Sequence, residues 1–289
     1  ALGGRDFARS IAPTPDGGVL VVVYAQATPE ALLIRLTPPG EALWTRPVSV
    51  GAGGSVATSR LLAHPDGSFL LEIYEELLGD PVATELQAFG SDGQLLWRRS
   101  LGPPSPGRPL RALASLTGGG WGIVADQGAP GAPSAPWVGR LGSDGSAGPW
   151  QPLGGEYCEF IDDREQCSFV VDAAGALLVA TSNGPVHRIR RIGPSSVLPD
   201  VTPPAGGWAP IQALAATGGG DVVVLDAPSN ARPRMFTVQS GAAATQRPDL
   251  VIEDAGSRRA VGIAWSATGA AWTMSVGGVS GRSRLTAYT

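Results

Sequence analysis

A pattern of two short strands recurs along this chain, and the repeat constrains the fold more than any other feature of the sequence. Each copy has an apolar segment, a tight turn with glycine, and a second apolar segment, as in IAPTPDGGVLVVVYA from Ile11. The turn glycines that align are Gly17, Gly67, Gly119, Gly175, Gly219 and Gly269, at spacings of 50, 52, 56, 44 and 50 residues. Self-similarity at such a period indicates a repeat architecture.

A second pair of strands follows the first pair in each of the first three copies. It reads ALLIRLTPPGEALWTR from Ala31, and its last strand carries a recurring tryptophan at Trp44, Trp97 and Trp150, which we expect to pack between repeats. Four strands joined by hairpin turns form a propeller blade, and no segment has a sustained helical period. The sequence therefore predicts an all-β, six-bladed β-propeller of four-stranded antiparallel blades.

We expect one domain, 1–289, whose ring is closed by the N-terminal segment. The sixth repeat stops after its third strand, SRLTAYT, so residues 1–8 are predicted to complete that blade's outer edge and to bring Ala1 close to Thr289. Closure of this kind leaves no unpaired strand edge. The predicted blades cover approximately 9–50, 59–102, 110–154, 167–203, 210–252, and 260–289 plus 1–8.

The strand–DG–strand run followed by "RLxxxGxxLWxRxLG" resembles bacterial propeller repeats of the SBBP type and their PQQ-like relatives. Residues 31–46 and 85–102 match best. Two departures are the count of six repeats rather than seven, and the loss of the glycine that usually ends the second strand. The resemblance implies a propeller fold and an exported bacterial protein, but no particular activity, because propellers host enzymes, binders and scaffolds alike.

Several classes of function are excluded or disfavoured by composition. The chain contains no lysine, since arginine accounts for all 21 basic residues, so neither a Schiff-base lysine nor a P-loop lysine exists. The net charge of −4 is spread evenly, which argues against a nucleic-acid partner. No window approaches the length of an apolar transmembrane helix. His64 and His187 are predicted at opposite ends of the blades, so they would not share a metal ion.

The two cysteines, Cys158 and Cys167, are nine positions apart. A disulfide is the favoured interpretation, because a zinc ion needs more ligands than this segment offers, and two free thiols in a cytoplasmic protein are the alternative. A disulfide favours a secreted, periplasmic or cell-surface protein. The chain opens without a signal peptide, which we interpret as already removed.

The candidate binding face lies at the channel mouth, where each second strand ends. The ligand-binding candidates are Tyr24, Tyr74, Glu75, Asp126, Ser182 and Asp226. A loop after the third blade should emerge on the same face, and its Asp162, Asp163 and Glu165 are candidate ligands for calcium, which prefers oxygen. The alternative is that these residues are ordinary polar loop ends.

Three functions remain open from the sequence. The preferred one is a non-enzymatic, exported scaffold that binds a protein or glycan partner through this face. The second is a metal-assisted hydrolase, lactonase or lyase with carboxylates at the mouth, since carboxylates alone can serve as acid and base. The third is a structural module of a cell-surface assembly.

Overall fold

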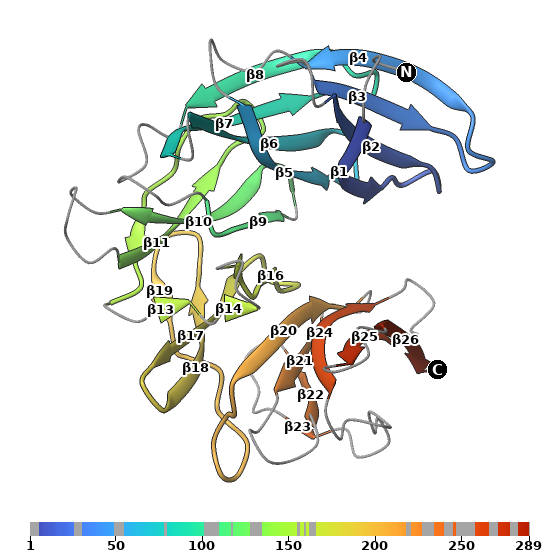
Figure 1. Cartoon of the computed structure of the whole chain (residues 1–289). Helices are drawn as coiled ribbons and strands as arrows, with labels where there is room; N and C mark the ends of the chain where they lie inside the picture. The colour runs from blue at the N-terminus through green and yellow to red at the C-terminus, as the bar shows by residue number, and fades with distance from the viewer. Residues whose placement is uncertain are drawn as a thin grey trace.

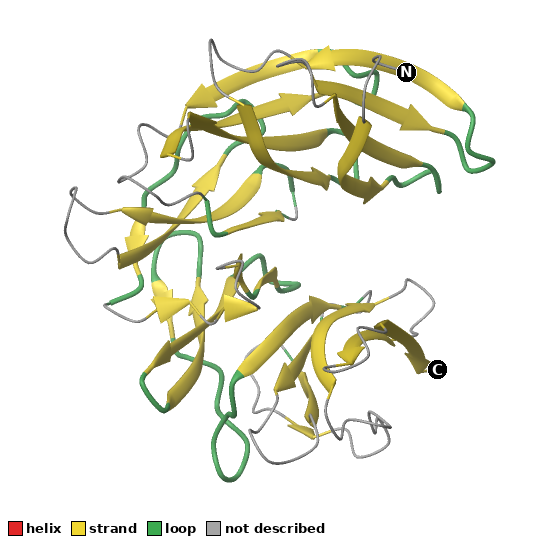
Figure 2. Ribbon diagram, viewed as in Figure 1, coloured by secondary structure: helices red, strands yellow, loops and turns green. Residues whose placement is uncertain are grey.

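The computed structural model of the protein consists of strands, turns and loops, with no α-helix among the residues that it describes (Figures 1 and 2). Those residues are 6–25, 31–48, 55–77, 80–100, 110–116, 118–127, 135–154, 157–158, 160–161, 166–217, 221–226, 234–239, 245–246, 258–265, 271–277 and 283–288. At some strand ends, and in all strands after residue 250, only the backbone is described. This part of the chain accordingly has no helix of the length and apolarity needed to cross a membrane.

Each of the six repeats forms one antiparallel sheet, and we number these sheets 1 to 6 in chain order. Sheet 1 contains β1 (Asp6–Pro13), β2 (Val19–Ala25), β3 (Ala31–Leu36) and β4 (Ala42–Val48). Sheet 2 contains β5 (Ser55–Ala63), β6 (Phe69–Leu77), β7 (Asp80–Phe89) and β8 (Leu95–Ser100). Sheet 3 contains β9 (Ala112–Ser115), β10 (Trp121–Gln127), β11 (Ala135–Leu141) and β12 (Gln151–Pro152).

The later sheets are less regular. Sheet 4 contains β13 (Tyr157–Cys158), β16 (Phe169–Val171), β17 (Leu177–Asn183), β18 (Val186–Ile192) and β19 (Val197–Leu198). A separate hairpin pairs β14 (Phe160–Ile161) with β15 (Gln166–Cys167). Sheet 5 contains β20 (Ile211–Ala216), β21 (Val222–Asp226), β22 (Arg234–Val238) and β23 (Thr245–Gln246). Sheet 6 contains β24 (Arg258–Trp265), β25 (Ala271–Gly277) and β26 (Ser283–Tyr288).

The turn between the first two strands has the same hydrogen bonds in successive sheets. In sheet 1 the amide of Gly17 donates to the carbonyl of Thr14 at 2.9 Å, and in sheet 2 the amide of Gly67 donates to the carbonyl of His64 at 2.9 Å. Both glycines have positive φ angles, 83° and 87°, which residues with a Cβ rarely adopt. The recurring glycine therefore specifies the recurring turn.

The sheets pack face to face through alternating apolar side chains. In β6, Phe69, Leu71 and Ile73 belong to the cluster shared with sheet 1, whereas Leu70 belongs to the cluster shared with sheet 3. This alternation follows from the two-residue period of a strand. Both faces of an inner sheet are therefore buried, and four such clusters connect sheets 1 to 5.

Two of the recurring tryptophans pack against the next sheet, as predicted. A Cβ at Gly93 would lie 3.0 Å from the Trp44 ring, and one at Gly145 would lie 2.8 Å from the Trp97 ring. The Trp97 indole also donates to the carbonyl of Ser143 at 2.6 Å. The third tryptophan differs, because Trp150 covers a glycine of its own sheet.

The sheets follow one another around an arc, and they do not close into a ring (Figure 1). The inner strands β1, β5, β9, β16 and β20 each contact the inner strand of the next sheet, which for β20 is β24. Residues 1–8 were predicted to complete the last blade, but residues 1–5 and Thr289 lie outside the described part of the chain. From Asp6 onward the segment belongs to β1, which pairs with β2 and places Asp6 opposite Ala25. Pairing across a short connection costs less loop entropy than pairing with a distant sheet. Among the described strands, none pairs with the outer edge of β26.

Candidate functional site

The predicted face residues lie at the ends of second strands. Tyr24 pairs with Ala31, Tyr74 with Thr84, Glu75 with Ala83, Asp126 with Pro136, Ser182 with His187, and Asp226 with Arg234. Of these six, only Ser182 and Asp226 have side chains among those that the structure describes. The positions of the other four side chains stay a prediction.

The predicted calcium and disulfide residues fall largely outside the described part of the chain. Asp162, Asp163 and Glu165 are not among the described residues. Cys158 lies in β13 and Cys167 in β15, and their side chains are likewise outside the description. The disulfide and the calcium site therefore stay predictions.

Ser182 and His187 both face sheet 5. In β17, Leu178 and Ala180 belong to the apolar cluster between sheets 4 and 5, and Ser182 lies two residues further along the same side of the strand. In β18, Ile189 belongs to that cluster and His187 shares its side. Since Ser182 pairs directly with His187, these two polar side chains end the apolar interface on sheet 4.

Asp226 and Arg234 face them from sheet 5. Val224 and Phe236 belong to the same apolar cluster, and Asp226 and Arg234 lie two residues from them on the same sides of their strands. The carboxylate of Asp226 is fully buried and accepts hydrogen bonds from Arg234 Nε at 2.9 Å and Nη2 at 2.5 Å. A bidentate pair of this kind fixes both partners in one geometry.

The same ion pair also holds the loop that precedes sheet 5. The amide of Ala209 donates to Asp226 Oδ2 at 3.0 Å, and Arg234 Nη2 donates to the carbonyl of Gly207 at 3.3 Å. Both carboxylate oxygens of Asp226 are thus occupied by protein donors. The observed role of Asp226 is to position this loop, and direct contact with a ligand stays a prediction.

Burial and charge act in opposite directions on His187. Burial lowers the pKa of the His187 imidazole, and the negative charge of Asp226 partly offsets this effect. The hydrogen bonds to Asp226 raise the pKa of the Arg234 guanidinium, and burial offsets this effect only in part. The cluster therefore combines a buried ion pair with one histidine whose pKa is lowered by burial.

A recess of about 370 Å³ opens beside this cluster, within the range of about 300–1,000 Å³ typical of ligand pockets. It is lined by Pro185, Val186, His187, Arg188, Asp200, Val201, Pro203, Gly206, Gly207 and Trp208. The Val186 side chain is 47% exposed, although it is apolar. At the rim, Asp200 forms an ion pair with Arg190, whose Nε lies 3.0 Å from Asp200 Oδ1.

Trp208 forms part of the recess wall. Its side chain is only 7% exposed, because its ring packs edge-on against Phe236 with 5.1 Å between the ring centroids. Its indole Nε1 is buried and has no hydrogen-bond partner.

Sequence reasoning missed the loop that forms the recess. Residues 199–210 carry no periodic pattern, so nothing in the repeat placed them against Asp226. The signal that could have found it is the run PPAGGW from Pro203, in which two prolines and two glycines bring an aromatic residue against the sheet. Within the described residues, no three His, Cys, Asp or Glu side chains form a group that could hold a metal ion.

No protein-family model matches the sequence, and a search of curated proteins gave no significant match. Solved structures do match. The β-propeller domain of the Trilobed protease from Pyrococcus furiosus has a TM-score of 0.63 at 9% identity, over 98% of this chain and 82% of that one. A glucose dehydrogenase has a TM-score of 0.53 at 12% identity, over 96% and 95%. A mutant of AofleA from Arthrobotrys oligospora has a TM-score of 0.51 at 12% identity, over 99% and 83%.

These similarities establish the fold of the chain as that of a β-propeller. The matching proteins include a protease domain and a dehydrogenase, and the identities are low. A shared propeller fold does not by itself transfer an activity. Function has to be argued from the site.

Proposed function

We propose that this protein is a non-enzymatic propeller scaffold that binds a protein partner in the recess beside Trp208. The observation that carries the proposal is a ligand-sized recess with Gly207 in its wall, and the buried Asp226–Arg234 pair holds Gly207 through a hydrogen bond from Arg234. Its apolar wall includes the exposed Val186, which suits an apolar side chain, and the charged rim suits polar contacts around it. A glycan is the alternative ligand, and the burial of Trp208 removes the ring face on which a sugar would stack.

A photo-crosslinking residue at position 186 tests the proposal on the whole protein. We expect a crosslink to one partner that is competed by unlabelled protein and lost when Val201 at the recess wall is changed to Arg. The matched control carries the same residue at position 96, because Leu96 is 57% exposed on the outer strand β8. Equal labelling from both positions would contradict the proposal. Binding on a glycan array that Val201→Arg abolishes would favour the glycan alternative.

We also propose that the protein is exported and carries the Cys158–Cys167 disulfide. The support is the spacing of the cysteines and the resemblance to exported bacterial propellers. Mass spectrometry of the alkylated protein tests it, since two thiols should react only after reduction. Alkylation of both thiols without reductant would contradict the disulfide.

We further propose that the six sheets are the six blades of one propeller, with no strand exchanged between the first and last. The support is the pairing of Asp6 with Ala25, which leaves β1 wholly in sheet 1. The propeller domain of the Trilobed protease is itself described as having an open velcro topology. Small-angle scattering in solution tests whether the arc closes into a compact ring.

An enzyme is the second candidate, because Ser182 is paired directly with His187 and Asp226 lies close enough to influence its pKa. Against a nucleophilic role, Asp226 is held by Arg234 and Ala209 rather than by the histidine. Carboxylate-based hydrolase, lactonase or lyase chemistry depends on side chains such as Asp126. Hydrolysis of an activated ester that Ser182→Ala abolishes, and Ser91→Ala does not, would favour this candidate over a scaffold.

A further inference from the structure

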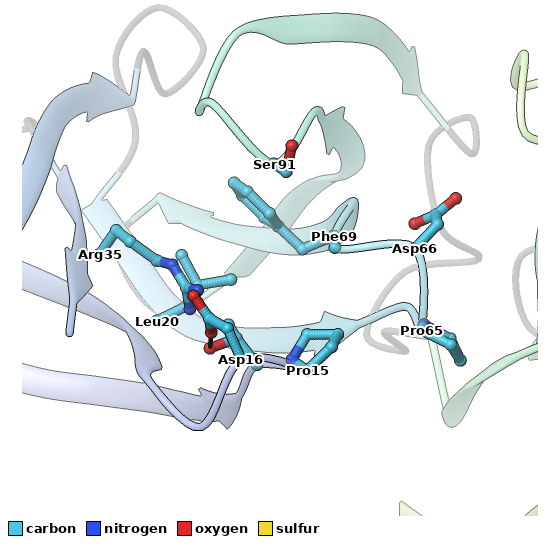
Figure 3. A pocket seen from close by; sticks show the side chains of 10 residues that line it. Pro15, Asp16, Leu20, Arg35, Pro65, Asp66, Phe69 and Ser91 are labelled. Carbon is cyan, nitrogen blue, oxygen red and sulfur yellow. Dashed lines mark hydrogen bonds and ion pairs between the residues drawn. The ribbon is translucent and has the colours of Figure 1, made fainter. Parts of the chain in front are cut away.

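Sheet 1 has one covered face and one uncovered face, and both are apolar. On the covered face, Leu20, Val22 and Leu33 are at most 1% exposed, because they pack against sheet 2. Figure 3 shows Leu20 of sheet 1 and Phe69 of sheet 2 at this contact. The residues that alternate with these along β2 and β3 form the uncovered face, and all six are half-buried: Val19, Val21, Val23, Leu32, Ile34 and Leu36.

The uncovered face is continuous across three strands. Val21 pairs with Ile11 of β1 on one side and with Ile34 of β3 on the other. Ile11 is 67% exposed, although it is a large apolar residue. None of the four apolar clusters among the described residues includes a side chain from this face. A continuous apolar surface of this kind marks a site of interaction.

The uncovered face corresponds to the face that sheets 2 to 5 each bury against the preceding sheet. In sheets 1 to 5 the first turn is closed by a hydrogen bond from an amide to the carbonyl four residues further on, and this bond aligns the second strands. Seven residues after that amide, sheet 1 has the half-buried Val21. The aligned residues of sheets 2 to 5 are each 0% exposed and belong to the cluster shared with the preceding sheet: Leu71, Ile123, Val179 and Val224.

Sheet 6 is the occupant that the chain itself supplies for this face. In a ring of six sheets, the sheet that precedes sheet 1 is sheet 6, and Figure 1 shows these two sheets at the two ends of the arc. Surfaces linked within one chain meet at a higher effective concentration than surfaces on separate molecules, which disfavours a second copy as the occupant. We propose that sheet 6 docks on the uncovered face of sheet 1 and closes the arc through side-chain packing, without a shared strand.

This docking rests on the proposal that the six sheets are blades of one propeller, and it identifies the surface that joins the first blade to the last. Covering the face removes apolar side chains from water, which is the same driving force that holds sheets 1 to 5 together. Sheet 1 would thereby gain on this side the joint that sheets 2 to 5 already have.

Photo-crosslinking of the whole protein tests the docking, with benzoylphenylalanine in place of Ile34. The chain has no lysine, so trypsin cleaves only after arginine and releases residues 260–282, which contain β25, as one peptide. We expect residue 34 to be joined to this peptide in a product that migrates as a single chain. The matched control has benzoylphenylalanine in place of Leu96, which is 57% exposed on β8 of sheet 2, and it should not label the peptide.

Val21→Arg provides a second test, because Val21 lies directly opposite Ile34. An arginine there would be buried without a partner by the docked sheet, so the yield of the crosslink from residue 34 should fall about tenfold or more. Leu96→Arg adds the same charge outside the uncovered face and should leave the yield unchanged. The crosslink from residue 34 in the otherwise unchanged protein decides the question even if Val21→Arg does not fold.

Three results would overturn the docking of sheet 6 on sheet 1. They are a crosslink from residue 34 to a second copy of the chain, the absence of a crosslink to residues 260–282, and equal labelling of that peptide from positions 34 and 96. Small-angle scattering separates this failure from that of the six-blade proposal. A compact ring without the crosslink overturns only the docking surface, whereas an extended arc without it overturns both. The recess beside Trp208 is tested independently, from position 186.

Discussion

Glu72 should make the stability of this protein fall as the pH rises. Its carboxyl group lies in β6 and is 2% exposed, facing the apolar contact between sheets 2 and 3. Burial raises the pKa of Glu72 to about 7, and the nearby Arg60, whose Nε lies 3.4 Å from Oε2, offsets this only in part. The protonated form is therefore the one that the folded protein accommodates best.

The size of the effect follows from the two pKa values. The ordinary pKa of the carboxyl is 4.5, and the value in the folded protein is about 7. Stability from this group is complete below pH 4.5 and is lost as the pH rises through about 7, at up to about 1.4 kcal/mol per pH unit. The total loss between pH 4 and pH 9 is about 3 kcal/mol.

Glu72→Gln isolates this contribution, because the amide keeps the shape of the protonated acid and does not titrate. The free energy of unfolding should be measured by urea denaturation, followed by tryptophan fluorescence, for both proteins from pH 4 to pH 9. We expect the variant to gain about 3 kcal/mol over the wild type across that range. Other groups titrate in both proteins and cancel in the difference.

Glu41→Gln is the matched control, because Glu41 is exposed in the turn before β4. Its difference from the wild type should stay within about 0.5 kcal/mol at every pH. A difference between Glu72→Gln and the wild type that does not change with pH would refute the reasoning. So would a variant that loses stability relative to the wild type as the pH rises.

Three further predictions concern packing, charge and metal. Gly93→Ala should destabilise the protein by about 1–3 kcal/mol more than Gly40→Ala in urea denaturation, because both turns have positive φ but only Gly93 lies under the Trp44 ring; equal losses would contradict that packing role. Arg234→Met should cost about 3–5 kcal/mol, since it leaves the buried Asp226 charge unpaired, and adding Asp226→Asn should recover much of the loss; no recovery would count against the ion pair. Chelation by EDTA should lower the melting temperature and added Ca²⁺ should restore it, and an unchanged curve would contradict a stabilising calcium site.

The strand pattern could be predicted from the sequence because the turn between the first two strands has a recognisable local sequence. The segments TPDGG and HPDGS place a glycine where the chain needs a positive φ, as Gly17 and Gly67 confirm. The alternating apolar residues on either side then specify strands whose two faces are both buried. The ends of the second strands, and so the positions of Ser182 and Asp226, followed from the same pattern.

The remaining features depend on contacts between segments far apart in the chain. Asp226 was predicted to contact a ligand. Its carboxylate instead forms a buried ion pair with Arg234, the first residue of the next strand. The sequence around Asp6 does not show which strand this segment pairs with, because an inner and an outer strand have the same alternation of apolar and polar residues. Glu72 is acidic within an apolar strand, and its burial becomes evident only when sheet 3 covers it.

The pairing of β1 within sheet 1 has a consequence for the order in which the sheets are expected to unfold. Where a propeller exchanges a strand between its first and last blades, backbone hydrogen bonds within the shared blade tie the two ends of the chain together. Here sheets 1 to 5 are joined by four clusters of apolar side chains, so the energetics approach a chain of nearest-neighbour couplings. The two end sheets each lack one such coupling, and unfolding should therefore begin at the seam and travel inward, sheet by sheet.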